Sequence, residues 1–332
     1  MRTLLISLSI WVSLTGCEQI LTYPKSDSKP QTCFETMWQT LHDRYSYFNL
    51  KGIDWDSVKT LYQPRIKNDM SDRELFTVLK EMLFVLRDGH VNLESPFDLA
   101  RNWNWYLDRP ENFNYPILER YYLKEDYEIT GPFVNRWFGN IGYIYYGSFS
   151  SGFRENELDA LLQKYKDARG LIIDIRNNGG GSLDNARALL KRFIDQKRPV
   201  LEWEYKKGKG IEDFYPSQIE YSEPGGEIRF TGKILLLTNR SSYSAATFFT
   251  AMMKSIPEVL SIGDTTGGGG GLPWLAELPN GWQYRFSSTR SKMPGGQDLE
   301  PGIPADSVII QTPEDLAGNK DPILEAAIKM LN

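Results

Sequence analysis

Two short, mostly apolar segments limit the fold more than any other feature of this chain. Gly170–Ile175 runs directly into a turn rich in Asn and Gly, 176–182, and then into a helical pattern over Leu183–Ile194. Lys233–Thr238 runs in the same way into a polar turn, 239–244, and a second helical pattern. Apolar strands without alternation are typical of parallel sheets buried on both faces. The repeated strand, turn and helix therefore predict an α/β fold, with both turns at the carboxyl ends of strands, where sites form.

The segment before this pattern is predicted to be helical. Ser71 and Glu74 have the spacing of a capping box, and the helix that they begin should end near Asp88 and Gly89. An earlier apolar stripe recurs at spacings of three and four residues: Phe34, Met37, Trp38 and Leu41.

Residues 91–140 are strand-like and rich in aromatic side chains. These side chains either line a cleft or pack against a sheet, and packing is the favoured interpretation. They are Trp103, Trp105, Tyr106, Phe113, Tyr115, Tyr121 and Tyr122.

The N-terminus has the features of an export signal. Arg2 precedes the apolar stretch Leu4–Leu14, which is too short to span a bilayer as a mature helix. It ends in Leu-Thr-Gly-Cys17, which resembles a bacterial lipobox, although an ordinary secretory signal with a chance Cys is the alternative. We expect a lipoprotein signal peptide (1–16), a tether (17–31), an N-terminal helical domain (32–95) and an α/β core (96–332). Lipid on Cys17 would anchor the protein in the bacterial cell envelope, facing the periplasm or the cell surface.

Composition excludes several other classes. A net charge of −5 argues against a nucleic-acid partner, because phosphate binding needs clustered Lys and Arg. The chain has two Cys, so a lipidated Cys17 leaves Cys33 without a partner and rules out a disulfide framework. The two His residues, His42 and His90, form no zinc-ligand spacing with Cys. We therefore expect no metal and no cofactor.

Ser244 is the first candidate for chemistry. It follows a buried strand and opens a helix, where the N–H of Ala245 is free to face the same space. Taken alone, this position also suits an ordinary helix cap. Three segments in order change the interpretation: Asp-Ile-Arg-Asn-Asn-Gly-Gly-Gly (174–181), Thr-Asn-Arg-Ser-Ser-Tyr-Ser-Ala-Ala (238–246) and Ile-Gly-Asp-Thr-Thr-Gly-Gly (262–268).

These segments together resemble the core of the C-terminal processing (tail-specific) peptidase superfamily. The resemblance covers roughly residues 140–310, with a weaker match through Leu-Arg-Asp-Gly-His (86–90). It implies a ClpP/crotonase-like core with Ser244 as nucleophile, and an oxyanion site formed by the N–H groups of Gly180, Gly181 and Ala245. The alternative for the glycine turn, a phosphate-binding loop, lacks the required Gly-Lys-Ser/Thr ending.

The chain departs from the superfamily's pattern at the base. Where many members carry a catalytic Lys, this alignment places Gly269, and no Lys occurs from 255 to 291. The tricorn branch instead uses a His at the point of His90, preceded by a Ser that is Gly89 here, and a late Glu that corresponds to Glu300. The resemblance thus implies His90 as base, at a pKa suited to the task, and Glu300 as supporting carboxylate.

Two further assignments remain open. Arg176 and Asn177 either fix the oxyanion turn or contact substrate, whereas Asp174 is expected to be structural. The stretch from His90 to Trp137 is too short for the PDZ module that tail-specific peptidases usually carry.

The sequence therefore predicts a serine peptidase of the cell envelope that acts on peptides or unfolded proteins. The missing Lys and the run Gly267–Gly271 motivate an alternative, a catalytically inactive protein that binds a peptide or an apolar ligand. An esterase-type hydrolase is a third alternative.

Overall fold

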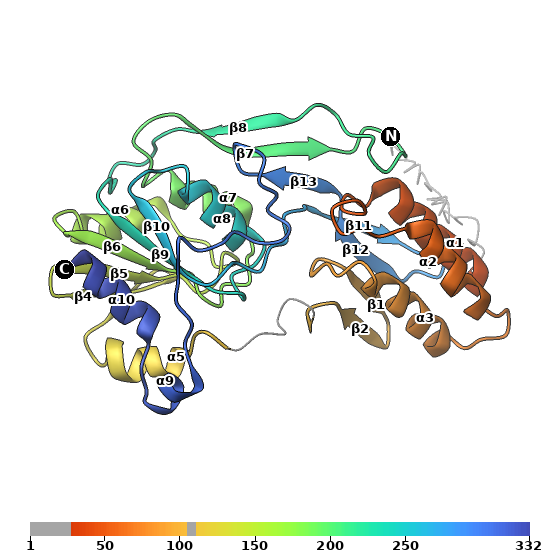
Figure 1. Ribbon diagram of the computed structural model, residues 1–332, viewed down its shortest axis with the longest axis horizontal. Coiled ribbons are helices and arrows are strands. Elements are labelled where there is room, and N and C mark those ends of the chain that lie inside the picture. Colours follow the sequence, from red (N-terminus) through yellow and green to blue (C-terminus); the bar gives the residue numbers. More distant parts are fainter. Residues whose placement is uncertain (1–27, 105–110) are drawn as a thin grey trace, which may run out of the picture.

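The computed structural model describes residues 28–104 and 111–332. Cys17 and the expected signal peptide lie outside the described residues. The described part forms an α/β lobe and an N-terminal lobe at opposite ends of the long axis, with a small sheet running between them (Figure 1). None of its helices is both long and apolar enough to cross a bilayer.

The α/β lobe is built on a seven-stranded sheet in the order β14-β10-β9-β6-β5-β4-β3. The strands from β14 to β5 are parallel, and β4 and β3 are antiparallel. In chain order they are β3 (Glu128–Thr130), β4 (Phe133–Phe138), β5 (Ile141–Tyr145), β6 (Gly170–Asp174), β9 (Ile234–Thr238), β10 (Val259–Gly263) and β14 (Ser307–Val308).

Alternating side chains of these strands fill a core on each face of the sheet. Ile173 packs with α6 (Glu155–Lys164), α7 (Leu183–Leu190) and α8 (Ala245–Met253), whereas its neighbour Ile172 packs with α10 (Pro322–Leu331). Both faces are covered, which is why the central strands are apolar throughout. The short helix α9 (Pro313–Ala317) precedes α10.

The N-terminal lobe packs helices on a four-stranded antiparallel sheet. The helices are α1 (Pro30–Arg44), α2 (Trp55–Tyr62) with the 3₁₀ turn η1 (Gln63–Arg65), and α3 (Asp72–Phe84). The sheet has the order β11-β12-β1-β2, from β1 (Asn92–Ser95), β2 (Asp98–Arg101), β11 (Pro273–Glu277) and β12 (Gln283–Ser287). Segments far apart in the chain therefore share one core, in which Leu93 and Leu79 pack with Tyr284.

A three-stranded sheet, β13-β7-β8, runs along the top of Figure 1 between the two lobes. It consists of β7 (Arg198–Tyr205), β8 (Gln218–Ser222) and β13 (Thr289–Lys292). β13 follows directly on β12 of the N-terminal lobe, so the chain itself crosses between the lobes at Ser288.

The predicted strand, turn and helix units are confirmed as β6 with α7 and β9 with α8, and the Ser71–Glu74 capping box begins α3. The stretch 91–140 is less regular than predicted. Within it, α5 (Tyr115–Ile117) and η2 (Leu118–Leu123) are helical, because Pro116 opens the turn and the Asn114 side chain accepts the Ile117 N–H.

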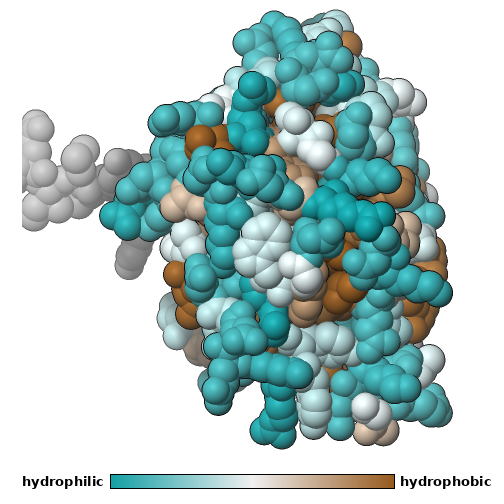
Figure 2. All heavy atoms as spheres, turned by 90° about the vertical axis from the view of Figure 1, so that its left-hand side faces the viewer, coloured by the Kyte–Doolittle hydropathy of each residue, from teal (hydrophilic) through white to brown (hydrophobic). Residues whose placement is uncertain are grey.

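The end of the α/β lobe that faces the viewer in Figure 2 is mainly hydrophilic, with apolar side chains in separate small patches. Exposed apolar side chains such as Ile129 and Val308 lie on the edge strands β3 and β14.

Candidate active site

Ser244 lies at a strained turn between β9 and α8. Its backbone has φ 54° and ψ −118°, which an L-residue adopts only when its surroundings enforce it. The Ser244 N–H donates to the Gly268 carbonyl at 2.9 Å, and the side chain makes no helix-capping bond. Its Oγ instead lies 2.9 Å from Nε2 of His90, so the side chain faces a base rather than the helix end.

His90 reaches this point from the other lobe, on the short connection between α3 and β1. Its backbone is held on both sides: its N–H donates to Asp88 Oδ1 at 2.8 Å, and its carbonyl accepts from Asn92 Nδ2 at 3.0 Å and from Arg285 Nε at 3.2 Å. The Tyr243 ring packs edge-on against the imidazole. Ser244 and His90, 154 positions apart in the chain, therefore meet at the junction of the lobes.

The imidazole of His90 is almost fully buried, and burial lowers its pKa to about 4. The cations Arg285 and Lys51 lower this pKa further, while the Asp88 carboxylate opposes them. At neutral pH His90 is uncharged, which leaves one ring nitrogen free to accept a proton from Ser244.

Glu300 is buried near the site, but the structure does not place it against His90. Its Oε1 lies 2.6 Å from Nζ of Lys51, and its Oε2 accepts the Gly270 N–H at 2.9 Å. Burial raises the pKa of Glu300 to about 7, against the opposing effects of Lys51 and the Gly270 N–H. Glu300 therefore acts on the loop that passes behind His90, and this loop is the glycine run.

The five consecutive glycines form a closely packed wall of the site. A side chain would meet neighbouring atoms at less than 3 Å at every position of the run: Gly267 at Arg240, Gly268 at Glu300, Gly269 at Tyr243, Gly270 at Glu300 and Gly271 at Ser287. At the position where superfamily members carry Lys, a Cβ would lie 2.5 Å from the Tyr243 ring. A backbone hydrogen bond from this wall, at Gly271, also raises the pKa of His90 against the effect of burial.

The predicted oxyanion groups surround Ser244, but they are not equivalent. The Gly180 N–H already donates to Asn178 Oδ1 at 3.0 Å. A Cβ on Gly180 would lie 2.9 Å from the Ala245 nitrogen, and Gly180 has a φ of 96°. No described residue accepts a hydrogen bond from the N–H of Gly181 or Ala245. The two free donors next to the nucleophile are therefore those of Gly181 and Ala245.

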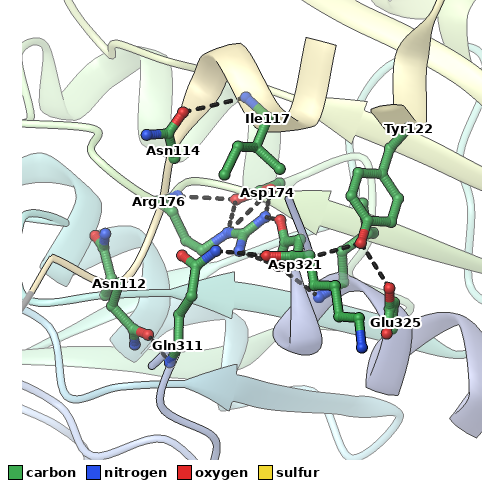
Figure 3. Close-up of polar contacts among 12 residues, drawn as sticks. Asn112, Asn114, Ile117, Tyr122, Asp174, Arg176, Gln311, Asp321 and Glu325 are labelled. Atoms are coloured by element: carbon green, nitrogen blue, oxygen red, sulfur yellow. Dashed lines mark hydrogen bonds and ion pairs between the residues drawn. The ribbon is translucent and has the colours of Figure 1, made fainter. Parts of the chain in front are cut away.

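Arg176 does not contact the cleft, which corrects the expectation that it could bind substrate. Its guanidinium is fully buried between Asp174 and Asp321, with five hydrogen bonds to their carboxylates (Figure 3). Phe113 packs against it, with the guanidinium carbon 4.4 Å from the ring centroid. Arg176 thus ties the strand end before the oxyanion turn to the N-terminus of α10, which agrees with the alternative that it fixes the turn. Asp174 is structural, as predicted.

Asn177 remains at the site. Its backbone has φ 57°, its N–H donates to Asn239 Oδ1, and its own Oδ1 accepts from Asn239 Nδ2 at 2.7 Å. It lies on the rim of a cleft of about 410 Å³ that exposes Ser244 and His90. Apolar side chains of Leu183, Phe248 and Leu272 line the same cleft. The described ranges contain no group of three His, Cys, Asp or Glu side chains arranged to hold a metal.

Three parts of the site carried no recognised signal in the sequence. Lys51, Asp88 and Ser287 surround His90 and Glu300, and Ser287 Oγ lies 3.4 Å from His90 Nδ1. Asp88 precedes His90 by two residues, in a segment whose resemblance to the tricorn branch concerns the His. Lys51 and Ser287 belong to no motif, so only the fold brings them to the site.

Comparison with known proteins finds relatives of this chain. The profile of peptidase family S41 matches residues 140–309, and that of the tricorn protease C1 domain matches residues 26–84. A protein of Staphylococcus epidermidis named as a CtpA-like serine protease is 30% identical over 178 residues. That alignment covers 53% of this chain but only 35% of the relative, so the chain matches about a third of the relative's length.

Solved structures extend the similarity to nearly the whole chain. A Parabacteroides merdae protein, described as a candidate peptidase, superposes with a TM-score of 0.88 at 41% identity, covering 92% of this chain and 97% of that one. Mature CPAF superposes with a TM-score of 0.69 at 13% identity over 91% of this chain and 96% of its own, which shows a shared fold.

Proposed function

We propose that this chain, which belongs to peptidase family S41, is a serine peptidase with Ser244 as its nucleophile and His90 as its general base. The observation that carries this proposal is the 2.9 Å contact between Ser244 Oγ and His90 Nε2 at a strained strand-to-helix turn. Strain at a nucleophile presents its hydroxyl above the sheet edge, as in other hydrolases with such a turn.

The proposed reaction is acyl transfer in two steps. His90 accepts the Ser244 proton as Oγ attacks the scissile carbonyl, and the N–H groups of Gly181 and Ala245 stabilise the resulting oxyanion. His90 then gives the proton to the leaving amine nitrogen, and a water molecule hydrolyses the ester of Ser244 by the same route. Gly180 contributes by having no side chain where Ala245 approaches.

Glu300 supports His90 indirectly in this proposal. Lys51 and Glu300 fix Gly270, and the adjoining Gly271 backbone faces the imidazole. Asp88 holds the His90 backbone and favours the imidazolium that forms during the reaction, because its carboxylate is buried nearby. Asn177 lies where it can contact the bound peptide.

Labelling with a fluorophosphonate probe tests the assignment. We expect the wild type to be labelled, and Ser244→Ala and His90→Ala to lose labelling and at least about 10³-fold in peptidase kcat/KM. Ser241→Ala, in the same turn, is the matched control and should still be labelled. Full activity in Ser244→Ala, or an unlabelled but folded wild type, would refute the mechanism and favour the ligand-binding alternative.

We also propose that the enzyme is a lipoprotein of the bacterial cell envelope, anchored through Cys17, that acts on peptides or unfolded proteins there. The lipobox-like Leu-Thr-Gly-Cys supports this location. Radiolabelled palmitate should enter the wild type and Cys33→Ser but not Cys17→Ser. Incorporation into Cys17→Ser would show that Cys17 is not the anchor.

A further inference from the structure

A row of polar side chains crosses the sheet of the N-terminal lobe beside the catalytic cleft. Leu275 of β11 pairs with Arg285 of β12, Arg285 with Asn92 of β1, and Asn92 with Arg101 of β2. Residues paired across adjacent strands point to the same face of a sheet. The residues that alternate with them, such as Leu93, Ala100 and Tyr284, lie in the core of the lobe, so this row is on the open face.

The open face is hollowed, and the hollow continues the catalytic cleft. A groove of about 300 Å³ is lined by this row, and it shares Trp103 and Arg285 with the cleft that exposes Ser244. Trp103 lies at the junction of the cleft and the groove. Its Nε1 donates to the carbonyl of Gly89, the residue before His90, at 3.0 Å. A peptide that occupies the cleft can therefore extend into the groove without leaving the protein surface.

The guanidinium groups in this groove have no anionic partner among residues 28–104 and 111–332. Arg285 uses Nε for the His90 carbonyl, and no described residue accepts a hydrogen bond from its two Nη groups. Arg101 lies over the Trp103 ring, 4.9 Å from its centroid, and pairs with no carboxylate of the described chain. By contrast, Arg187 of α7 and Arg290 of β13 each form a two-point ion pair with a Glu.

Two further features favour an anionic ligand. Among the described residues that line the groove, Glu94 is the one acidic side chain, so these residues carry a net positive charge in a chain of net charge −5. The Asn92 Oδ1 atom is buried with no hydrogen-bond partner in the described structure, although its Nδ2 holds the His90 carbonyl. Polar atoms in such a position are usually satisfied by water or a ligand, and an N–H of a bound peptide would suit this oxygen.

We propose that this groove, defined by Asn92, Arg101, Trp103, Leu275 and Arg285, binds a carboxylate of the peptide substrate. Guanidinium and carboxylate groups form paired, charge-assisted hydrogen bonds, which are among the strongest in proteins. The carboxylate comes from the peptide's C-terminus or from an Asp or Glu side chain. The proposal rests on the peptidase function proposed above, since it assigns a substrate class to the same cleft.

Binding to the inactive variant Ser244→Ala separates the groove from catalysis. Fluorescein-labelled peptides of one sequence are compared as free acid and C-terminal amide, each with an internal Glu or Gln. We expect loss of the recognised carboxylate to weaken binding by at least about tenfold, an effect typical of a charge-assisted bond. The acid–amide pair and the Glu–Gln pair show which source is used.

Substitution of Arg101 then locates the effect. Arg101→Gln in the Ser244→Ala background should reduce the preference for the carboxylate form, and added salt should reduce it in the same direction. Arg73→Gln is the matched control, because Arg73 lies over Phe97 much as Arg101 lies over Trp103 but belongs to α3, outside the groove. Thermal unfolding confirms that each variant is folded.

The outcomes distinguish this proposal from the catalytic one. Equal affinity for all four peptides would refute carboxylate binding in the groove, even if the wild type is labelled at Ser244. A carboxylate preference that Arg101→Gln leaves unchanged would refute it as well. A carboxylate preference that depends on Arg101, found in a protein whose wild type is not labelled, would support the groove and overturn the catalytic assignment.

Discussion

The two lobes contribute to the site in different ways. The α/β lobe supplies Ser244 and the oxyanion turn through local strand, turn and helix units, with β6 and β9 as adjacent strands of one sheet. The N-terminal lobe supplies His90 from a connection between a helix and a strand in a separate core. The nucleophile and its oxyanion donors are therefore formed within one lobe, whereas the pairing of serine with histidine depends on how the lobes dock.

Near the site, polar contacts of the described residues join the loop between α1 and α2 to residues outside the N-terminal lobe. Lys51, from the loop between α1 and α2, meets Glu300 beyond β13, and the pair is buried. The carbonyl of Ser46 on the same loop accepts from Arg290 Nε of β13. We infer that variants in the α/β lobe disturb the nucleophile itself, and variants of these contacts disturb its alignment with His90.

Among variants that leave Ser244 and His90 in place, the largest effect is expected within the α/β lobe, from Gly180→Ala. The methyl group would meet the Ala245 nitrogen and Ser244 Cβ at 2.9 Å, at a φ of 96° that Ala tolerates poorly. We expect kcat/KM to fall by about 10² to 10³-fold, as for loss of an oxyanion donor, with KM changed little. Steady-state kinetics of peptide cleavage measure this.

The neighbouring glycine provides the control for that variant. A side chain on Gly179 would meet no atom within 4 Å. Gly179→Ala should therefore keep activity within a few-fold of the wild type. Similar losses in both variants would show that the turn is sensitive to any change, and the specific packing of Gly180 against Ser244 would then lose its support.

A smaller effect is expected from the contact between the lobes. Lys51→Met removes the ammonium that faces the buried Glu300 carboxylate at 2.6 Å, and Glu300→Gln removes the charge of that carboxylate. Breaking a buried pair from one side commonly costs about 3–5 kcal/mol of stability. We expect each single variant to lose about 10-fold to 100-fold in kcat through misalignment of His90. The double variant should recover part of both losses, because no charge is left unpaired.

A double-mutant cycle on kcat and on the free energy of unfolding measures the coupling. Lys59→Met is a matched control, because Lys59 pairs with Glu35 at the surface of the same lobe, and surface pairs contribute little. Strictly additive effects of Lys51→Met and Glu300→Gln on kcat would mean that the pair does not act as a unit on His90.

The sequence predicted the parts of the site that are formed locally within the α/β lobe better than the parts that depend on distant residues. Ser244, Gly181 and the strands before them were predicted because their signals are local: an apolar run, a glycine turn and a helix lie within about a dozen residues of one another in the chain. The fold and family were predicted from these segments. The sequence could not decide between two roles for Arg176, because it does not show that the buried guanidinium would pair with Asp321, 145 positions later.

The glycine run shows most directly which property of the site a sequence does not predict. In the sequence, Gly267–Gly271 motivated an inactive protein, since the expected Lys was missing. In the structure these glycines pack against Tyr243, Ser287 and Glu300, and together they form the wall behind His90. Close approach of backbones is a tertiary property, so a run of glycines by itself cannot distinguish a packed wall from a flexible linker.

The smallest and most specific effect concerns the pKa of His90, on which Asp88, Lys51 and Arg285 of its own lobe act. Catalysis needs neutral His90, so kcat/KM should fall as the pH drops toward the pKa of about 4. Asp88→Asn removes the anion that raises this pKa, so the acid limb should move to lower pH. Lys51→Met removes a cation that lowers this pKa, so the acid limb should move to higher pH.

NMR titration of His90 is an independent measure of the pKa, and His42→Gln leaves a single imidazole to observe. A purely structural role for Asp88 and Lys51 would change the height of the pH profile but not shift its acid limb in opposite directions. Limbs that coincide in the two variants would therefore contradict an electrostatic effect of these two charges on His90.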